Sequence, residues 1–390
     1  MSSEVGSPKV EARHVRPSRS RRLRLQTCLL LLVAPAVICT SAFAQPQDIA
    51  RPSFSEWLAG VRTDALARGI RPEIVDEALA GLEEPLPVVL ERDRSQAETV
   101  LSLETYLARA LAPKTIRAGR EIVKRHRALL NEVSERYGVP PRIIAGIWGM
   151  ESSFGRFTGT RPVVAALATL AWDPRRSTFF RGELLDALEI VNRGDIELAG
   201  LRGSWAGAMG QVQFMPSSYL KFAEDWDGDG RRDVWSDEAD IFASIANYLK
   251  GNGWRADETW GREVAVGREA ARRIAGGVAR RSGGCRARRD MTVALPRARW
   301  DELGVRLPGG KALPASMPPA SLVSGTTRHF LVYQNYDALL EYNCANAYAL
   351  GVALLAERIG STAPLPPERK AAPARKKVAP PRKKAPRRRG

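Results

Sequence analysis

One glutamate stands within an apolar segment near the middle of this 390-residue sequence. Glu151 follows Trp148 and Met150 and precedes Phe154, at the end of a segment with helical spacing. A carboxyl group among such neighbours is partly shielded from water, which raises its pKa and favours the protonated form. The segment therefore predicts a general acid that works near neutral pH, with a solvated glutamate at a helix end as the alternative.

A second candidate segment covers residues 203–219 and reads GSWAGAMGQVQFMPSSY. Its glycines and alanines permit close approach of the backbone, while Ser204, Gln213 and the aromatic residues offer hydroxyl, amide and stacking partners for sugars. A glycine-rich turn before a helix that begins near Pro216 would explain the small residues. Such a turn would not explain Gln213 and Phe214 beside them, so we interpret the segment as part of a carbohydrate site.

Acidic residues alternate in the segment that begins at Asp225. Asp225, Asp227 and Asp229 follow the opening of a calcium loop, with Gly230 at its sixth position. Carboxylates at this spacing place hard oxygen ligands around one cation. Ser236 stands at position twelve, where such loops usually have glutamate. The three aspartates are predicted metal ligands, with a solvated acidic turn as the alternative.

These candidate residues depend on helices for their positions. Apolar residues recur every three or four positions over much of the chain, which predicts a mainly α fold. The predicted helices cover residues 54–82, 97–136, 143–153, 163–170, 178–192, 217–224, 239–251 and 346–358, and the predicted strands 264–266 and 330–333. Residues 267–327 are rich in Arg, Gly and Pro and predict a small irregular subdomain with long loops.

The formal net charge of +17 is concentrated at the two ends of the chain. Residues 1–44 contribute +5 and residues 365–390 contribute +10, which leaves +2 for residues 45–364. A nearly neutral folded region lacks the basic face that binds a phosphate backbone, so we predict no nucleic-acid partner. Residues 363–390 predict a disordered basic tail that either has no partner or binds anionic envelope polymers or a membrane surface.

The N-terminal residues have the order of a secretory signal peptide. A basic stretch leads into apolar residues 28–39 and then into a small-x-small sequence that ends at Ala44. This order predicts a signal peptide over residues 1–44, cleaved after Ala44, and a periplasmic protein, with an uncleaved membrane anchor as the alternative. Cleavage leaves Cys285 and Cys344 in an oxidising compartment, and the sequence alone does not decide whether they pair.

The two apolar motifs together carry a specific resemblance. The pattern Gly149-x-Glu151-Ser152-x-Phe154-Gly155, followed by residues 207–219, closely resembles the membrane-bound lytic transglycosylase B family, glycoside hydrolase family 103. The resemblance extends over residues 54–358. It implies a lysozyme-like catalytic core with an additional helical domain and the small irregular subdomain, which together make a catalytic region over residues 45–362.

The resemblance also implies a reaction and a set of site residues. Glu151 would be the single catalytic carboxylate, first acid and then base, and would cleave the β-1,4 bond between N-acetylmuramic acid and N-acetylglucosamine in peptidoglycan to form a 1,6-anhydromuramoyl product. A glycan groove would be lined by Tyr106, Arg175, Arg176, Ser204, Met209, Gln213, Phe214, Tyr248, Tyr342, Asn343 and Tyr348.

The sequence leaves two alternative functions open, and the resemblance also implies a bound calcium ion. A hydrolytic muramidase would need a second carboxylate, for which Asp173 and Glu183 stay open, and a noncatalytic peptidoglycan-binding envelope protein would need none. By the resemblance, the acidic loop closes at Asp240, one residue beyond the family's spacing, with a backbone carbonyl near Arg231 as a further ligand. We therefore expect structural calcium and no organic cofactor.

Overall fold

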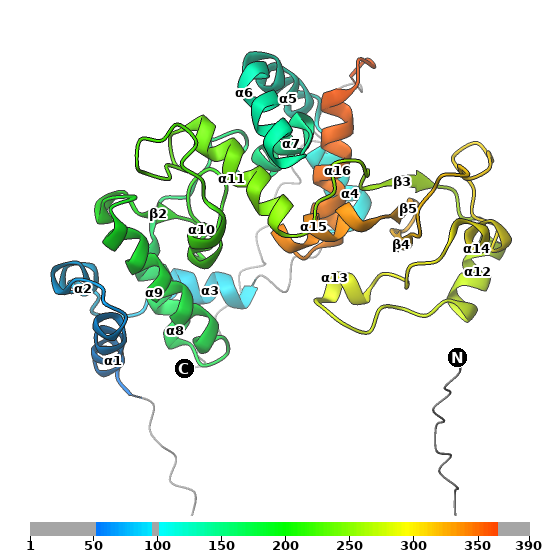
Figure 1. Cartoon of the computed structure of the whole chain (residues 1–390). Helices are drawn as coiled ribbons and strands as arrows, with labels where there is room; N and C mark the ends of the chain where they lie inside the picture. The colour runs from blue at the N-terminus through cyan, green and yellow to red at the C-terminus, as the bar shows by residue number, and fades with distance from the viewer. Residues whose placement is uncertain (1–51, 96–100, 366–390) are drawn as a thin grey trace, which may run out of the picture. The chain divides into compact units, whose positions relative to one another are not determined.

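The computed structural model describes residues 52–95 and 101–365. The predicted signal peptide, with its cleavage after Ala44, and the predicted tail from residue 366 onward lie outside the described residues. Within those residues helices dominate, and the mainly α prediction is confirmed (Figure 1). All helices of the described ranges are too short or too polar to span a lipid bilayer.

In the described residues, six helices precede the segment that carries Glu151. They are α1 (Phe54–Ala67), α2 (Pro72–Leu79), α3 (Pro87–Ser95), α4 (Leu103–Ala110), α5 (Pro113–Arg125) and α6 (Arg127–Tyr137). The sequence predicted two long helices here, but prolines divide them. Pro72 and Pro113 each begin a new helix, because the first helical position needs no backbone N–H donor.

Helix α7 (Pro141–Ser152) is buried on nearly every side and carries Glu151 in its last turn. It packs against α16 (Asn346–Gly360) and α11 (Glu238–Gly251), and its proximity to both is visible in Figure 1. Helix α8 (Val163–Trp172) packs against α9 (Ser177–Arg193), which also contacts α10 (Pro216–Phe222). These helices share one apolar core, so close-packed atoms fix the end of α7.

A short antiparallel sheet joins the loop after α7 to the glycine-rich segment. Strand β1 (Arg161–Pro162) pairs with β2 (Arg202–Gly203), which follows the 3₁₀ helix η2 (Leu198–Gly200). Isolated bridges from Gly203 to Met209 and from Met209 to Phe214 continue this pairing into the glycine-rich segment. Backbone pairing therefore ties the segment after the Glu151 motif to the glycine-rich segment.

The predicted small subdomain lies between α11 and α15 (Gln334–Tyr342) and is more regular than predicted. Its antiparallel sheet has the strand order β3 (Gly261–Val264), β5 (His329–Val332) and β4 (Ser321–Ser324). Its helices are α12 (Arg268–Gly277), α13 (Arg286–Arg289) and α14 (Arg297–Glu302). A second apolar cluster around the fully buried Trp300 gives this subdomain its own core.

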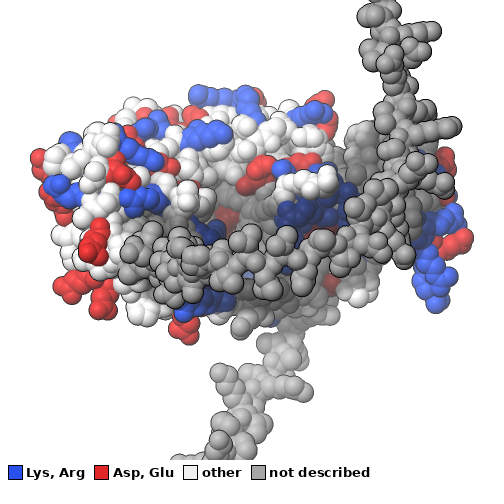
Figure 2. Space-filling view, turned by 90° about the horizontal axis from the view of Figure 1, so that it is seen from below, with Lys and Arg blue, Asp and Glu red and all other residues white. Residues whose placement is uncertain are grey.

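A disulfide links Cys285 of the subdomain to Cys344, in the segment between α15 and α16, with the two Cα atoms 6.4 Å apart. The pairing that the sequence left open is therefore made. Charged residues are mixed on the face shown in Figure 2, where Lys and Arg lie beside Asp and Glu and do not form one continuous basic patch. This mixture agrees with the small net charge of residues 45–364.

Candidate active site

Glu151 lies in the last turn of α7, beside the buried side chain of Tyr348 from α16. The Tyr348 hydroxyl donates a hydrogen bond to Glu151 Oε1. Residue Glu151 keeps some exposed surface, but protein atoms replace most of the water around its carboxyl group. Burial raises the pKa of Glu151 to about 7, and the Tyr348 hydrogen bond opposes part of this rise by stabilising the carboxylate. At neutral pH the group is divided between its acid and base forms.

Three further tyrosines surround Glu151: Tyr106 from α4, Tyr248 from α11 and Tyr342 from α15. Burial is the main cause of the raised pKa of each phenol, and the negative charge of Glu151 adds to it. The rings of Tyr248 and Tyr342 have centroids 4.6 Å apart, and Tyr342 stacks on Tyr348 at 6.4 Å. The predicted tyrosines therefore come together around the acid.

Phe214 and Met209 complete this arrangement from the glycine-rich segment. The Phe214 ring lies 5.3 Å from Tyr248 and 5.6 Å from Tyr342, measured between centroids. Met209 is fully buried, and its backbone N–H donates to the Phe214 carbonyl at 2.8 Å. We call Glu151, the four tyrosines, Phe214 and Met209 the Glu151 cluster.

Backbone contacts from the tyrosine hydroxyls fix the walls of the Glu151 cluster. Tyr342 donates to the Val212 carbonyl at 2.8 Å, and Tyr248 donates to the Glu341 carbonyl at 2.7 Å. These two bonds tie α15 to the glycine-rich segment and to α11. The rings therefore have fixed positions before any ligand binds, which reduces the entropy lost on binding.

The backbone beside Glu151 adopts left-handed conformations at residues other than glycine. Ser153 has φ 51°, Phe154 has φ 59°, and Gln213 in the glycine-rich segment has φ 53°. Among the described residues these are the only non-glycine residues with positive φ. Each such conformation costs about 1–3 kcal/mol, and they concentrate at functional sites. Their position on both motifs supports a functional role for this region.

Ser204 and Gln213 shape the glycine-rich segment from within. Ser204 Oγ accepts hydrogen bonds from the backbone N–H groups of Ala206 and Ala208 at 3.2 and 3.0 Å. Because both lone pairs of Ser204 are used, its hydroxyl proton is the group it can offer to a ligand. Gln213 Nε2 donates to the carbonyls of Thr158 and Gly210 at 3.0 and 2.9 Å. In this structure both side chains hold the segment in place.

Gln211 is a residue that the sequence interpretation missed. Its Oε1 accepts from Trp148 Nε1 at 2.9 Å, and its Nε2 donates to the Trp235 carbonyl at 2.8 Å. A Cβ atom at Gly155 would lie 2.2 Å from Gln211 Oε1, so glycine is required there for the amide to fit. Gln211 thus joins α7 to the acidic loop. In the sequence it differs little from Gln213 two positions later.

The predicted groove residues Arg175 and Arg176 are held elsewhere. Arg175 Nη2 lies 2.6 Å from Asp93 and Nε 3.0 Å from Asp173, while Arg176 lies 3.9 Å from Asp93. Within the described residues, no hydrogen bond or ion pair joins either arginine to the Glu151 cluster. Asn343 is exposed and directly follows Tyr342. The ligand roles of these three residues stay predictions.

The two carboxylates left open as second catalytic groups have other partners. A hydrogen bond from Arg175 lowers the pKa of Asp173, against the effect of its burial. Glu183 accepts from the Ser217 backbone N–H at 2.9 Å and from Ser217 Oγ at 2.7 Å, which satisfies a donor in the first turn of α10. Burial is the main cause of the raised pKa of Glu183. Both acids therefore have structural roles in this fold.

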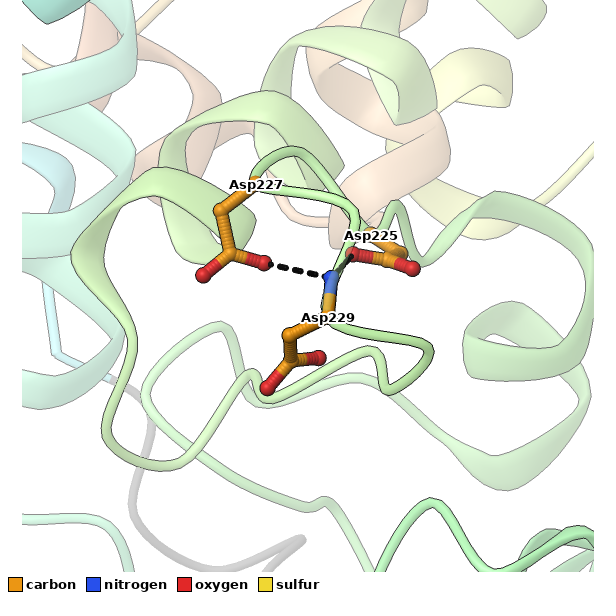
Figure 3. Close-up of side chains that lie close together, drawn as sticks. All are labelled: Asp225, Asp227 and Asp229. Atoms are coloured by element: carbon orange, nitrogen blue, oxygen red, sulfur yellow. Dashed lines mark hydrogen bonds between the residues drawn. The ribbon is translucent and has the colours of Figure 1, made fainter.

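The acidic loop, residues 225–240, brings its first three aspartates together (Figure 3). One carboxylate oxygen from each of Asp225, Asp227 and Asp229 lies within 4.8 Å of the others. The Asp229 backbone N–H points between the first two residues, at 3.1 Å from Asp225 Oδ1 and 3.1 Å from Asp227 Oδ1. This convergence of hard oxygen atoms suits a calcium ion.

Asp240 closes the acidic loop from the first turn of α11. Its carboxylate accepts from the backbone N–H groups of Trp226 and Asp233, each at 2.7 Å, and burial raises its pKa to about 6. Asp240 shares a cavity of about 120 Å³ with Asp227, Asp229 and Arg231. The Arg231 guanidinium lies 3.1 Å from Asp229 Oδ2. Further acidic residues that the loop pattern did not indicate also line this cavity, namely Asp233 and Asp237.

The fold is mainly helical, with one shielded acid at the end of α7 and a loop of convergent carboxylates before α11. Residues 53–357 match the family model for the transglycosylase SLT domain. The chain belongs to this family. The family assignment and the mainly α fold predicted from the sequence are therefore confirmed.

Similar proteins narrow the comparison. Membrane-bound lytic murein transglycosylase B of Escherichia coli is 41% identical over 150 residues, which make up 38% of this chain and 41% of that protein. The match thus spans less than half of that relative's length.

Solved structures cover more of the chain. SltB3 from Pseudomonas aeruginosa, in complex with NAG-anhNAM-pentapeptide, is 38% identical with a TM-score of 0.70, over 79% of this chain and 80% of that one. The Escherichia coli lytic transglycosylase SLT35, in complex with calcium, is 27% identical with a TM-score of 0.65, over 80% of this chain and 93% of that one. These likenesses confirm the predicted lysozyme-like fold.

Proposed function

We propose that this protein is a lytic murein transglycosylase that cleaves the β-1,4 bond between N-acetylmuramic acid and N-acetylglucosamine in peptidoglycan. The observation that carries the proposal is the setting of Glu151, a shielded carboxyl group with a pKa of about 7 and a tyrosine hydroxyl on one oxygen. Such a group can give a proton and take one back at the same pH. The likeness to SltB3 with a bound NAG-anhNAM-pentapeptide supports the substrate class.

The reaction uses Glu151 twice. In its protonated form, Glu151 transfers a proton to the glycosidic oxygen as the C1–O bond breaks, and the 2-acetamido group of the muramic acid stabilises the positive charge at C1. The resulting carboxylate then removes the proton from the C6 hydroxyl as its oxygen bonds to C1. The product is a 1,6-anhydromuramoyl end, and no water is consumed.

Tyr348 prepares Glu151 for both steps. Its hydrogen bond to Oε1 leaves Oε2 to carry the transferred proton. The packed rings of Tyr248, Tyr342 and Phe214 form an aromatic wall beside Glu151 that limits the entry of water, which would otherwise compete with the C6 hydroxyl.

Product analysis tests this function. Mass spectrometry of sacculi digested by the protein is expected to show anhydromuropeptides, and Glu151→Gln is expected to lower their release about 100- to 10,000-fold. The exposed Glu132→Gln, which removes the same charge from α6, serves as the matched control and keeps full activity. Reducing N-acetylmuramic acid ends would establish a hydrolytic muramidase instead. Unchanged activity of Glu151→Gln would contradict the assigned acid.

We further propose that the acidic loop holds a structural calcium ion. The three convergent carboxylates, with Asp240 on the cavity that Asp227 and Asp229 line and a backbone carbonyl near Arg231, would form an oxygen donor set of the kind that calcium prefers. The ion would neutralise the repulsion among these aspartates and fix the loop that contacts Gln211. Calcium in the SLT35 structure supports this assignment.

The proposed activity fits a periplasmic location, reached through the predicted signal peptide over residues 1–44. Binding of anionic envelope polymers by the basic tail also stays a proposal. N-terminal sequencing of the exported protein tests the first point, because cleavage after Ala44 places Gln45 at the new N-terminus. An intact N-terminus would identify an uncleaved anchor.

A further inference from the structure

The short segment 343–345 joins α15 to α16, and a tyrosine of the Glu151 cluster lies on each side of it. Tyr342 is the last residue of α15, and Tyr348 lies in the first turn of α16. The Tyr348 hydroxyl bonds Glu151, and the Tyr342 ring stacks on the Tyr348 ring. The position of this segment therefore affects how two aromatic side chains meet the acid.

Helix α16 begins without a capping side chain. Ala345 occupies its N-cap position, where alanine has no oxygen to accept the free N–H groups of the first turn. The backbone is extended at Asn343 and at Ala345. Packing against α7 holds the body of α16, but its entry depends on contacts from outside the helix.

The small subdomain supplies those contacts. Cys344, in the middle of the segment, forms the disulfide with Cys285, which directly precedes α13. Asn346, the first residue of α16, donates from Nδ2 to the Ala287 carbonyl of α13 at 2.9 Å. One covalent bond and one hydrogen bond therefore tie the start of α16 to the same short helix.

Other noncovalent contacts would remain if the disulfide opened. Arg288 of α13 lies 2.7 Å from Glu341 Oε1 and 3.6 Å from Asp337 Oδ1, both on α15. These ion pairs keep α13 beside α15, so loss of the disulfide would loosen the segment without detaching the subdomain. We therefore expect a partial loss of activity, in contrast to the loss caused by removing Glu151.

The disulfide is open to thiol exchange from one side. Cys344 is exposed, whereas Cys285 packs against the core. A thiolate of a dithiol reductant can attack the Cys344 sulfur, which forms a mixed disulfide there and releases Cys285 as a thiolate. The second thiol of the reductant then displaces Cys344. Two electrons pass to the protein sulfurs, and the reductant leaves as its own disulfide.

We propose that the Cys285–Cys344 disulfide is a redox-sensitive clamp that positions Tyr342 and Tyr348 at Glu151, and that a dithiol reductant lowers activity by opening it. This inference rests on the proposed function, because the two tyrosines serve its catalytic acid. The cysteines act through the tyrosines and are positioning residues. An oxidant that restores the disulfide restores the activity.

The first test compares the oxidised protein with the protein reduced by dithiothreitol. Reduction is expected to lower kcat on sacculi about fivefold and to change KM less than about twofold. The falling limb of the pH profile should move to higher pH, because a weaker bond from Tyr348 stabilises the Glu151 carboxylate less and raises its pKa. Oxidised glutathione should reverse both changes.

Variants separate the clamp from a general loosening of the subdomain. Cys285→Ser combined with Cys344→Ser is expected to show the reduced profile with and without dithiothreitol. The control is Thr292→Val, which removes the acceptor of the Leu322 backbone N–H in the same subdomain, at 2.8 Å. It should lower Tm and leave the pH profile unchanged. A falling limb that stays in place after reduction, or a double variant with the oxidised profile, would overturn the proposal.

A measurement without substrate separates this inference from the proposed function. Carbon-13 NMR of glutamate-labelled protein follows the titration of Glu151, whose signal is the one missing from Glu151→Gln. Its pKa is expected to rise on reduction. If the oxidised protein releases no anhydromuropeptides, the proposed function fails, while a pKa that rises on reduction still supports the clamp. An active oxidised protein whose Glu151 pKa does not change on reduction would overturn the clamp alone.

Discussion

Carboxyl groups serve the Glu151 cluster and the acidic loop in opposite ways. In the Glu151 cluster one acid stands among four tyrosines, with one hydroxyl donor on its carboxylate, and burial raises its pKa to about 7. In the acidic loop several exposed aspartates lie together and accept backbone N–H groups. The backbone and side chain of Arg231 lower the pKa of Asp229, for example.

The difference shows that surroundings decide what a carboxyl group does. Burial raises the pKa of an isolated acid in a shielded site, so the acid is protonated at a higher pH and can transfer its proton to a substrate. A cluster of ionised acids at the surface repels itself and gains from a cation. Asp240 lies between these cases, since burial raises its pKa to about 6 while two backbone donors favour its charged form.

Among the variants that test this comparison, Tyr348→Phe is expected to change activity most. Tyr348→Phe removes the hydrogen bond that stabilises the Glu151 carboxylate, so the pKa of Glu151 rises further. Because the first step needs protonated Glu151, activity falls as pH rises through this pKa, and the falling limb is expected to move to higher pH. The rate at the optimum drops about 10- to 100-fold as the acid loses its orientation.

The pH profile of sacculus cleavage measures this change. Tyr336→Phe is a matched control, because it removes a buried tyrosine hydroxyl of α15 that bonds Asn346 rather than Glu151. Its falling limb stays at the wild-type pH. A Tyr348→Phe profile that keeps its position would mean that Tyr348 does not set the pKa of Glu151.

Calcium should act on the acidic loop by a smaller and separate effect. An ion that binds the folded state at a concentration 100-fold above its Kd adds about 2.7 kcal/mol of stability, or roughly 5 °C in Tm for a domain of this size. We expect calcium to raise Tm by this amount and a chelator to reverse it. Differential scanning calorimetry measures the shift.

Variants separate calcium binding from a general salt effect. Asp227→Asn removes one charge of the convergent group and is expected to abolish most of the calcium-dependent rise in Tm. Asp290→Asn, at an exposed residue of the small subdomain, keeps the full rise. An equal rise with magnesium in all three proteins would contradict a calcium site.

Local patterns in the sequence predicted the helix that carries Glu151 better than the helices that surround it. The helix ending at Glu151 was predicted over residues 143–153 and spans Pro141–Ser152. Helix α15, with three charged or amide residues among its first four positions that conceal its apolar spacing, was missed. Strand β4 was missed too. Its four residues form a strand because they pair with β5, and this tertiary contact leaves no pattern in so short a segment.

The site was predictable where its residues are close in sequence. Apolar neighbours indicated Glu151, with a solvated glutamate as the alternative, and spacing indicated the three aspartates of the acidic loop. Tyr348 lies 197 positions from Glu151, so its place in the Glu151 cluster followed from family resemblance and not from any local pattern. Gln211 had no such signal, because its role depends on two tryptophans, Trp148 and Trp235, that the fold brings to it.

Gln211→Ala is expected to have the smallest effect of these variants. It tests the contact between the Glu151 cluster and the acidic loop. Gln211→Ala leaves Trp148 Nε1 and the Trp235 carbonyl without this partner, which is expected to lower the free energy of unfolding by about 1–3 kcal/mol. Chemical denaturation measures the loss. Since Gln211 is the bridge from α7 to the acidic loop, the variant should also weaken any effect of calcium on kcat, while calcium still raises Tm. If calcium changes kcat equally in both proteins, the coupling does not pass through Gln211, and the Glu151 cluster and the acidic loop communicate by another contact or act independently.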